Sequence, residues 1–200
     1  MIGFWLKRAL DLVVAVVGLV LLSPLFAYCA LAIKRDAPGP VLYRQERVGL
    51  RGRRFQIVKF RTMGVDAEGQ WVPPQSKDEL SHFYFQDEAD PRITRVGRWL
   101  RRTSLDELPN LWNVLRGEMS LVGPRPEVPE IVALYDDTMK KRLDVKPGLT
   151  GLAQVSGRGL LSTAETIDYD LEYCRRWSLS EDLKILWSTL KAVSNRKGAI

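Results

Sequence analysis

The chain has 200 residues, of which 46% are hydrophobic and 27% charged, a composition that indicates one folded domain and excludes a disordered or fibrous protein. Its net charge of +6 predicts an anionic partner such as phosphate, nucleic acid or a membrane surface. The two cysteines, Cys29 and Cys174, form no CxxC motif and accompany a single histidine, which argues against a disulfide framework, a Cys/His zinc site and a cysteine protease. We expect both thiols to be reduced packing residues.

Residues 9–33 are almost entirely apolar and long enough for a membrane helix, although no signal-peptidase-like site follows them. Basic residues flank the segment on both sides, with Lys7 and Arg8 before it and Lys34 and Arg35 after it. Because cytoplasmic flanks collect lysine and arginine, this charge pattern predicts that both ends of the segment face the cytoplasm.

Ser23-Pro24 lies inside this apolar segment. Pro24 has no N–H for the carbonyl of Val20, so the helix is expected to bend there. The arm before the bend is about 21 Å long at about 1.5 Å per residue, shorter than the hydrocarbon core of about 30 Å. A kinked true span is the alternative. We favour a re-entrant membrane helix over residues 1–35, broken at Ser23-Pro24.

Residues 41–63 contain two β-leaning stretches around 49–52 and predict a short hairpin. Most of its basic side chains are expected to be solvated or to rest on anionic lipid, whereas Lys59 and Arg61 at the strand end are better candidates for a site. Residues 64–91 are polar and interrupted by Pro73-Pro74, and we expect them to form a long variable loop, an excursion from the catalytic domain.

Apolar periodicity predicts five further helices, the first of them amphipathic with a cationic face. They are expected from Arg92 onward, at 108–116, at 127–143, at 163–176 and at 179–193. The last helix is preceded by Ser178 and Glu181 at capping-box spacing.

Asp106 and Glu107 are adjacent carboxylates that follow a run rich in arginine. Ser104 and Glu107 have the S-x-x-E spacing of a capping box, and by spacing alone capping is the favoured interpretation. The surrounding cations support a functional alternative, because a carboxylate can be a covalent nucleophile or a Mg²⁺ ligand where arginines hold phosphate.

Arg125 stands between Pro124 and Pro126, which fix the backbone on both sides of it. Two glycine-rich stretches, 146–151 and 156–159, each carry a basic residue. Neither matches the GxGxxG or GxxxxGK[ST] fingerprint, so a Rossmann domain or a P-loop NTPase is not indicated.

Taken together, these motifs resemble the bacterial sugar transferases, specifically the small monotopic phosphoglycosyl transferases that start glycoconjugate assembly on a polyprenyl phosphate. The resemblance extends from Lys7 to Val193 and rests on KRALDL (7–12), SP (23–24), GPVLYRQERVG (39–49), FQIVKFRTM (55–63), RRTSLDELPNLWNVLRGEMSLVGPRPE (101–127) and KPGLTGLAQVSGR (146–158). It implies a re-entrant helix bent at Ser-Pro. It also implies ping-pong transfer of a sugar-1-phosphate from a UDP-sugar through an aspartyl-phosphosugar adduct, with release of UMP.

The resemblance also implies roles for individual residues. Asp106 would be the nucleophile and a Mg²⁺ ligand, and Glu107 would assist in metal and proton handling. The substrate-binding residues would be Lys59, Arg125, Arg158 and Asp168.

We therefore expect a mostly helical α/β protein, with a re-entrant membrane helix at 1–35 and a compact catalytic domain at 36–200 that carries amphipathic interfacial helices. Its expected location is the cytoplasmic face of the bacterial inner membrane. The expected partners are a UDP-sugar, undecaprenyl phosphate and membrane lipid, with no nucleic acid; a homo-oligomer is left open, as are the sugar and the glycan pathway. The alternative is a membrane-anchored basic protein without catalysis, either a nucleic-acid binder or an adaptor.

Overall fold

The computed structural model describes residues 2–65, 67, 72–83, 90–157 and 160–195 of the chain. The elements follow in the order α1 (Ile2–Leu21), α2 (Ser23–Asp36), β1 (Leu42–Val48), the 3₁₀ helix η1 (Leu50–Gly52), β2 (Arg54–Phe60), α3 (Lys77–Ser81), α4 (Arg95–Thr103), the 3₁₀ helix η3 (Leu105–Asn110), α5 (Leu111–Arg116), β3 (Ser120–Val122), α6 (Pro129–Val132), the 3₁₀ helix η4 (Met139–Asp144), β4 (Gly148–Thr150), α7 (Leu152–Ser156), α8 (Thr163–Arg176) and α9 (Leu179–Asn195).

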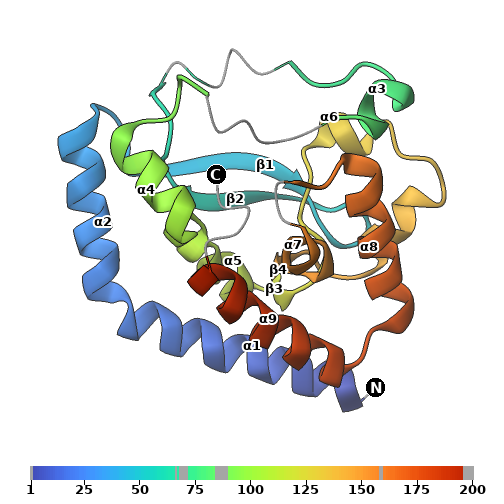
Figure 1. Ribbon diagram of the computed structural model, residues 1–200. Coiled ribbons are helices and arrows are strands. Elements are labelled where there is room, and N and C mark those ends of the chain that lie inside the picture. Colours follow the sequence, from blue (N-terminus) through green and yellow to red (C-terminus); the bar gives the residue numbers. More distant parts are fainter. Residues whose placement is uncertain (1, 66, 68–71, 84–89, 158–159, 196–200) are drawn as a thin grey trace.

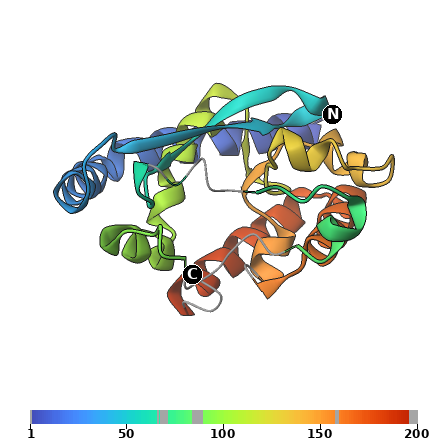
Figure 2. The ribbon, with the colours of Figure 1, turned by 90° about the horizontal axis from the view of Figure 1, so that it is seen from above.

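Helices dominate the fold, as predicted, and the sheet is confined to two pairs of strands. In Figure 1, α1 runs along the bottom of the molecule, α2 rises from its end, and the β1–β2 hairpin crosses the middle. Figure 2 shows the hairpin on one side of the molecule and the C-terminal helices α8 and α9 on the other.

The N-terminal apolar segment bends where the sequence predicts, with an angle of 60° between α1 and α2. The hydroxyl of Ser23 donates to the carbonyl of Val20 at 2.8 Å. This is the carbonyl that Pro24 leaves without a backbone donor, so the serine satisfies the group that the proline frees. Within the described residues, neither helix alone has the length and apolarity to cross a membrane, whereas the bent pair satisfies both criteria together.

The basic residues ahead of the apolar segment point into the protein. Lys7 Nζ lies 2.6 Å from the carboxylate of Asp182 on α9. Arg8 donates to the carbonyls of Val114 and Leu115, at 2.7 and 2.9 Å, and so caps the C-terminal end of α5. Lys7 and Arg8, which the sequence analysis interpreted as a cytoplasmic flank, therefore bind α1 to α9 and α5.

Asp11, the single acid of the apolar segment, is also used for packing. Its carboxylate accepts from the backbone N–H of Leu121 at 2.9 Å and from the hydroxyl of Ser120 at 3.1 Å. Ala15, one turn further along α1, is completely buried in the main core. One face of α1 thus packs on β3 and α5, while Val13, Val17 and other apolar side chains on the remaining surface are exposed.

The predicted hairpin is confirmed: β1 and β2 pair antiparallel, with Leu42 opposite Phe60 and Val48 opposite Arg54. Phe55 and Ile57 are buried in the main core, whereas Phe60 is buried in a second cluster with Cys29, Ile33 and Leu100. Lys59 lies near the end of β2, one residue before the strand leaves the sheet. The hairpin therefore presents Lys59 from a rigid element.

The first glycine-rich stretch is part of a second, parallel strand pair, β3–β4, which the sequence analysis did not predict. A Cβ on Gly148 would lie 2.1 Å from the backbone nitrogen of Gly123, and one on Gly151 would lie 2.2 Å from the oxygen of Gly123. These glycines are needed for close backbone packing. They hold β4 against the segment that leads to Arg125.

The helix predicted over 127–143 is wrong. The chain forms only the short α6 and η4 there. Between them the carboxylate of Asp136 accepts from the backbone N–H groups of Thr138 and Met139, at 2.9 and 2.8 Å. This local side-chain bonding takes N–H groups that a continuous helix would use, so η4 begins as a separate element.

The amphipathic helix α4 begins at Arg95, three residues later than expected, because Thr94 caps it by accepting from the backbone N–H of Gly97 at 3.0 Å. A Cβ on Gly97 would lie only 2.0 Å from the carbonyl oxygen of Thr62. The helix therefore lies directly against the chain that leaves β2.

The last two helices match their predicted positions closely. Ser178 caps α9 by accepting from the backbone N–H of Glu181 at 3.2 Å. A complete capping box lies instead at the start of α8, between Ser162 and Glu165. The cysteines are free, Cys29 buried and Cys174 partly buried, in agreement with their expected packing role.

Candidate active site

The two adjacent carboxylates lie on η3, beside strand β2. Helix α4 ends at Thr103, and the next residue, Ser104, has φ 57° and ψ 17°, so the chain reverses before η3 begins. A left-handed conformation is uncommon for serine and marks a tight turn. It brings Asp106 and Glu107 next to Lys59.

Glu107 is held by two cations. Its Oε1 lies 2.8 Å from Lys59 Nζ and 2.9 Å from Arg125 Nη1. Burial acts to raise the pKa of Glu107, but Arg125 and Lys59 hold it well below its usual range. The capping-box interpretation is therefore wrong: Ser104 provides no side-chain cap to η3, and the carboxylate of Glu107 points to the hairpin and the Arg125 loop.

Asp106, unlike Glu107, makes no ion pair with a described residue that would hold its carboxylate. Among the residues that the structure describes, none donates a hydrogen bond to its carboxylate. Burial, together with the neighbouring charge of Glu107, raises the pKa of Asp106 to about 6, against the influence of Lys59, Arg101 and Arg125. One carboxylate of the pair is thus committed to ion pairs, while the other is available at the edge of a cationic cluster.

Arg125 is placed by a loop whose backbone is fixed at four consecutive positions, 124–127. Each carbonyl of the loop accepts a hydrogen bond, from Gly148 N at 2.9 Å, an Arg142 Nη at 2.9 Å, an Arg47 Nη at 3.1 Å and Val48 N at 2.8 Å, in chain order. The flanking prolines restrict the same backbone further. The guanidinium of Arg125 is therefore presented to Glu107 by a pre-organised loop.

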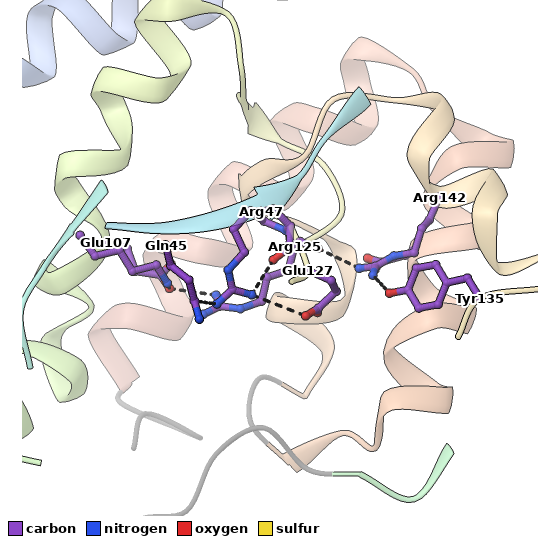
Figure 3. A network of polar contacts seen from close by, with 10 residues as sticks. Gln45, Arg47, Glu107, Arg125, Glu127, Tyr135 and Arg142 are labelled. Carbon is purple, nitrogen blue, oxygen red and sulfur yellow. Dashed lines mark hydrogen bonds and ion pairs between the residues drawn. The ribbon is translucent and has the colours of Figure 1, made fainter. Parts of the chain in front are cut away.

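Arg47 adds a third cation beside Lys59 and Arg125. It lies 3.6 Å from the buried carboxylate of Glu127 and donates to Gln45 at 2.6 Å. Figure 3 shows Arg47 and Arg125 side by side, with Glu107 at one end of the network and Arg142 at the other. Sequence reasoning treated Arg47 only as one charge of a basic hairpin face; no local pattern distinguishes it.

Arg101 is a further cation that the sequence analysis did not single out. It is held by a hydrogen bond from its Nε to the hydroxyl of Thr62 at 3.0 Å, and its charge acts on Asp106. Its position in the arginine run, one helical turn before the carboxylates, is the signal that was available. Cations from α4, β2 and the Arg125 loop therefore converge on η3.

A small pocket opens between the hairpin, η3 and the Arg125 loop. It is lined by Arg47, Ile57, Lys59, Glu107, Asn110, Met119, Arg125, Pro126 and Gly148. The side-chain oxygen of Asn110 is buried here, and no described residue donates to it. Such a group is satisfied by a polar ligand or by water. The pocket thus combines three cations, one ion-paired carboxylate and a free acceptor.

Comparison with known proteins assigns the chain to a family. Residues 2–196 match the model of the bacterial sugar transferases. The chain belongs to the bacterial sugar transferase family. The predicted resemblance is confirmed at this level.

Curated relatives of this bacterial sugar transferase fall into two groups by length. Exopolysaccharide production protein ExoY of Rhizobium meliloti (strain 1021) is 42% identical over 203 residues, which cover 99% of this chain and 89% of that protein. Galactosyl transferase CpsE of Streptococcus agalactiae serotype III (strain NEM316) is 42% identical over 194 residues, covering 96% of this chain and 43% of the relative.

A third relative is the UDP-glucose:undecaprenyl-phosphate glucose-1-phosphate transferase of Escherichia coli (strain K12), 43% identical over 193 residues. The match covers 92% of this chain and 39% of that protein. The chain thus spans less than half the length of several curated relatives that it matches, CpsE among them.

The structure brings four of the predicted site residues together: Lys59, Asp106, Glu107 and Arg125. Asp168 lies exposed on α8, and no described contact joins it to the carboxylate pair. Arg158 lies outside the described residues. Arg61, the other hairpin candidate, donates to the carbonyls of Ala37 and Pro38 and so fixes the end of α2.

The donor set of the site suits Mg²⁺ better than a transition metal. No group of three or more histidine, cysteine or acidic side chains that could hold a metal occurs in the described part of the chain. Mg²⁺ commonly uses one or two carboxylates together with substrate phosphate and water. Asp106 provides an unengaged carboxylate of this kind, with Glu107 beside it.

Proposed function

We propose that this chain transfers a sugar-1-phosphate from a UDP-sugar to undecaprenyl phosphate, with release of UMP. The observation that supports the proposal most strongly is the contrast within the carboxylate pair. Glu107 is neutralised by Lys59 and Arg125, whereas Asp106 keeps an unbonded carboxylate among cations that suit a diphosphate. The names of the relatives, which include undecaprenyl-phosphate glucose and galactose phosphotransferases, point to the same reaction class.

The proposed reaction has two steps at phosphorus. A carboxylate oxygen of Asp106 attacks the sugar-linked phosphorus, the bond to the oxygen that bridges to the second phosphorus breaks, and UMP leaves with that oxygen. A phosphate oxygen of undecaprenyl phosphate then attacks the phosphorus of the adduct, and the bond to Asp106 breaks. The carboxylate is regenerated and the product is undecaprenyl diphosphosugar, which gives ping-pong kinetics.

The neighbouring cations have distinct tasks in this scheme. Lys59 and Arg125 keep Glu107 ionised and place positive charge where the phosphoryl oxygens gather negative charge. Arg101, on α4, stabilises the ionised form of Asp106. Because each carbonyl of the Arg125 loop is held by a hydrogen bond, little reorganisation of this loop is needed when the donor binds.

Mg²⁺ is proposed to bind at Asp106, with Glu107 assisting, and it would supply charge neutralisation for the donor diphosphate. Asp106 is suited to this because its carboxylate has no described hydrogen-bond donor. Glu107 is less available, since both Lys59 and Arg125 contact its Oε1.

Membrane association is proposed for the bent pair α1–α2. Apolar side chains on this pair are exposed, including Val20 and Leu21 beside the bend and Tyr28 and Leu31 on α2. A re-entrant arrangement would immerse them in the lipid and hold the site at the headgroup plane, where the acceptor phosphate lies. The proposed location is the cytoplasmic face of the inner membrane, and the proposed pathway position is the first membrane step of glycan assembly.

The reaction is tested by UMP release in detergent from a panel of UDP-sugars, with and without undecaprenyl phosphate. We expect release by the wild-type chain and none by Asp106→Ala, while Asp137→Asn, which changes an exposed carboxylate between α6 and η4, should retain activity. Absence of UMP from every donor would contradict the proposal and favour a non-catalytic basic membrane protein.

Re-entry is tested separately by labelling single cysteines from each side of the membrane, in a chain whose native cysteines have been replaced. Cysteines near Trp5 and near Arg35 should both be labelled from the cytoplasm. A residue near Trp5 that is reachable only from the periplasm would contradict re-entry.

A further inference from the structure

The buried polar cluster of Arg142, Asp170 and Tyr135 has no place in the proposed chemistry and yet reaches the active-site loop. Arg142 and Asp170 are 3% and 1% exposed and form an ion pair. The same guanidinium contacts the hydroxyl of Tyr135 and donates to the main-chain carbonyl of Arg125 at 2.9 Å. Figure 3 shows Arg142 and Tyr135 beside the Arg125 loop, on the side away from Glu107.

We propose that Arg142, oriented by Asp170 and Tyr135, is a positioning residue that fixes Arg125 against Glu107. The link is direct, because the Arg125 carbonyl and the Arg125 guanidinium belong to the same residue and are bonded on opposite sides, to Arg142 and to Glu107. Rotation of that peptide would move the guanidinium away from the carboxylate. The role in turnover rests on the proposed function.

Stability alone is a poor explanation for this cluster. Arg142 Nε and one oxygen of Asp170 are buried with no described partner. Burial raises the pKa of Asp170 to about 6 even though Arg142 acts in the other direction. Buried ion pairs are often no better for stability than well-packed apolar residues, so an incompletely satisfied one suggests a geometric role.

The cluster has the geometry that positioning needs. A planar guanidinium can serve the carboxylate, the phenol and the carbonyl at once, which an ammonium cannot do in the same directions. Asp170 is supplied by α8 and Arg142 by η4, so two elements far apart in sequence converge on one carbonyl. Asp168, two residues before Asp170, is exposed on the same helix.

The chain offers a matched control. Asp182 is another buried carboxylate that pairs with a cation, Lys7, and with a tyrosine hydroxyl, Tyr173. It holds α1 to α9 and makes no described contact with residues 124–127, although Lys7 also donates to the carbonyl of Val122, three residues before Arg125, at 3.0 Å. Arg142→Met/Asp170→Leu therefore removes a pair that bonds the Arg125 carbonyl itself, whereas Lys7→Met/Asp182→Leu removes a similar pair that bonds the end of β3 instead.

Two readouts separate positioning from general destabilisation. The first, independent of turnover, is the rate at which phenylglyoxal modifies Arg125, read by peptide mass spectrometry. Glu107→Gln, which frees the guanidinium directly, is the positive control. We expect faster modification of Arg125 in Arg142→Met/Asp170→Leu and no change in Lys7→Met/Asp182→Leu.

The second readout is UMP release. We expect kcat/KM to fall about tenfold or more in Arg142→Met/Asp170→Leu, as when residues that orient active-site groups are removed. The loss should divide between kcat and KM as it does in Arg125→Lys. In an Arg125→Ala background the same double change should lower kcat/KM little further. Any fold loss of kcat/KM caused by Lys7→Met/Asp182→Leu should instead multiply with the loss caused by Arg125→Ala.

An unchanged rate of Arg125 modification, or activity losses that multiply with Arg125→Ala, would overturn the inference. If the double variant does not fold, Arg142→Lys is measured in its place and is expected to move both readouts in the same direction. A wild-type chain that releases no UMP would refute the proposed function, and the modification rates would still decide whether Arg142 positions Arg125.

Discussion

Replacing Asp106 by asparagine is expected to make the protein more stable at pH 8 while removing its activity. The pKa of Asp106 is raised from 3.8 to about 6, chiefly by burial and then by Glu107. The folded state therefore binds this proton more tightly than the unfolded state does. Ionisation of Asp106 therefore lowers the free energy of unfolding as the pH rises through 6. Below pH 3.8 this destabilisation is absent.

The size of the effect follows from that shift. A change of about two pKa units corresponds to about 3 kcal/mol, and because the Asp106 side chain retains some accessible surface, solvent screening reduces this to about 1–2 kcal/mol. For a chain of this length that is a rise of about 3–6 °C in melting temperature. Asparagine has the same shape without the charge, so Asp106→Asn should show this gain at pH 8 and lose it below pH 4.

Glu107→Gln provides the opposite case at the adjacent position. Lys59 and Arg125 hold the pKa of Glu107 below its usual range, so its charge stabilises the fold above the unfolded pKa and that stabilisation is lost as the pH falls. We expect Glu107→Gln to melt lower than wild type at pH 8. Asp168→Asn, on the exposed face of α8, should melt like wild type.

The assay is thermal unfolding in detergent with EDTA between pH 4 and pH 8, because bound metal would stabilise the ionised carboxylate. If Asp106→Asn and Glu107→Gln both lower the melting temperature at pH 8, the assignment of opposite electrostatic roles to the two carboxylates is wrong.

Three further outcomes are expected. Gly97→Ala should lower the melting temperature sharply, since its Cβ would lie 2.0 Å from the carbonyl oxygen of Thr62, whereas Gly64→Ala, with no atom within 4 Å of its Cβ, should not; equal melting would contradict the close approach of α4 to the chain after β2. Pro24→Ala restores an N–H for Val20 and should widen the distance between spin labels on α1 and α2, while an unchanged distance would show that the bend does not depend on the proline. EDTA should stop UMP release and added Mg²⁺ should restore it, and turnover that persists in EDTA would exclude the metal assignment.

Local features of the sequence predicted local structure well. Pro24 determines which carbonyl is left free, and the hairpin around 49–52 and the helices α8 and α9 appear within a few residues of their expected bounds. The failure at 127–143 has a local cause as well. The carboxylate of Asp136 binds backbone N–H groups that a continuous helix would use, and apolar periodicity does not reveal such competition.

The active site was predictable only in part. The S-x-x-E spacing at Ser104 favoured a helix cap, and the contact that draws Glu107 away from such a cap is with Lys59, 48 residues away in the sequence. The same applies to Arg142 and Asp170, which are 28 residues apart and meet only after folding. Lys7 and Arg8 were taken as flanking charges because their partners, Asp182 and the end of α5, are also distant in sequence.

The covalent role of Asp106 is tested most directly by intact-protein mass spectrometry after incubation with UDP-sugars in the absence of lipid acceptor. The account predicts a mass gain of one phosphosugar for the wild-type chain with its own donor, and no gain for Asp106→Asn. An unmodified wild-type chain, with UMP released only when undecaprenyl phosphate is added, would contradict the covalent step and indicate direct transfer between donor and acceptor.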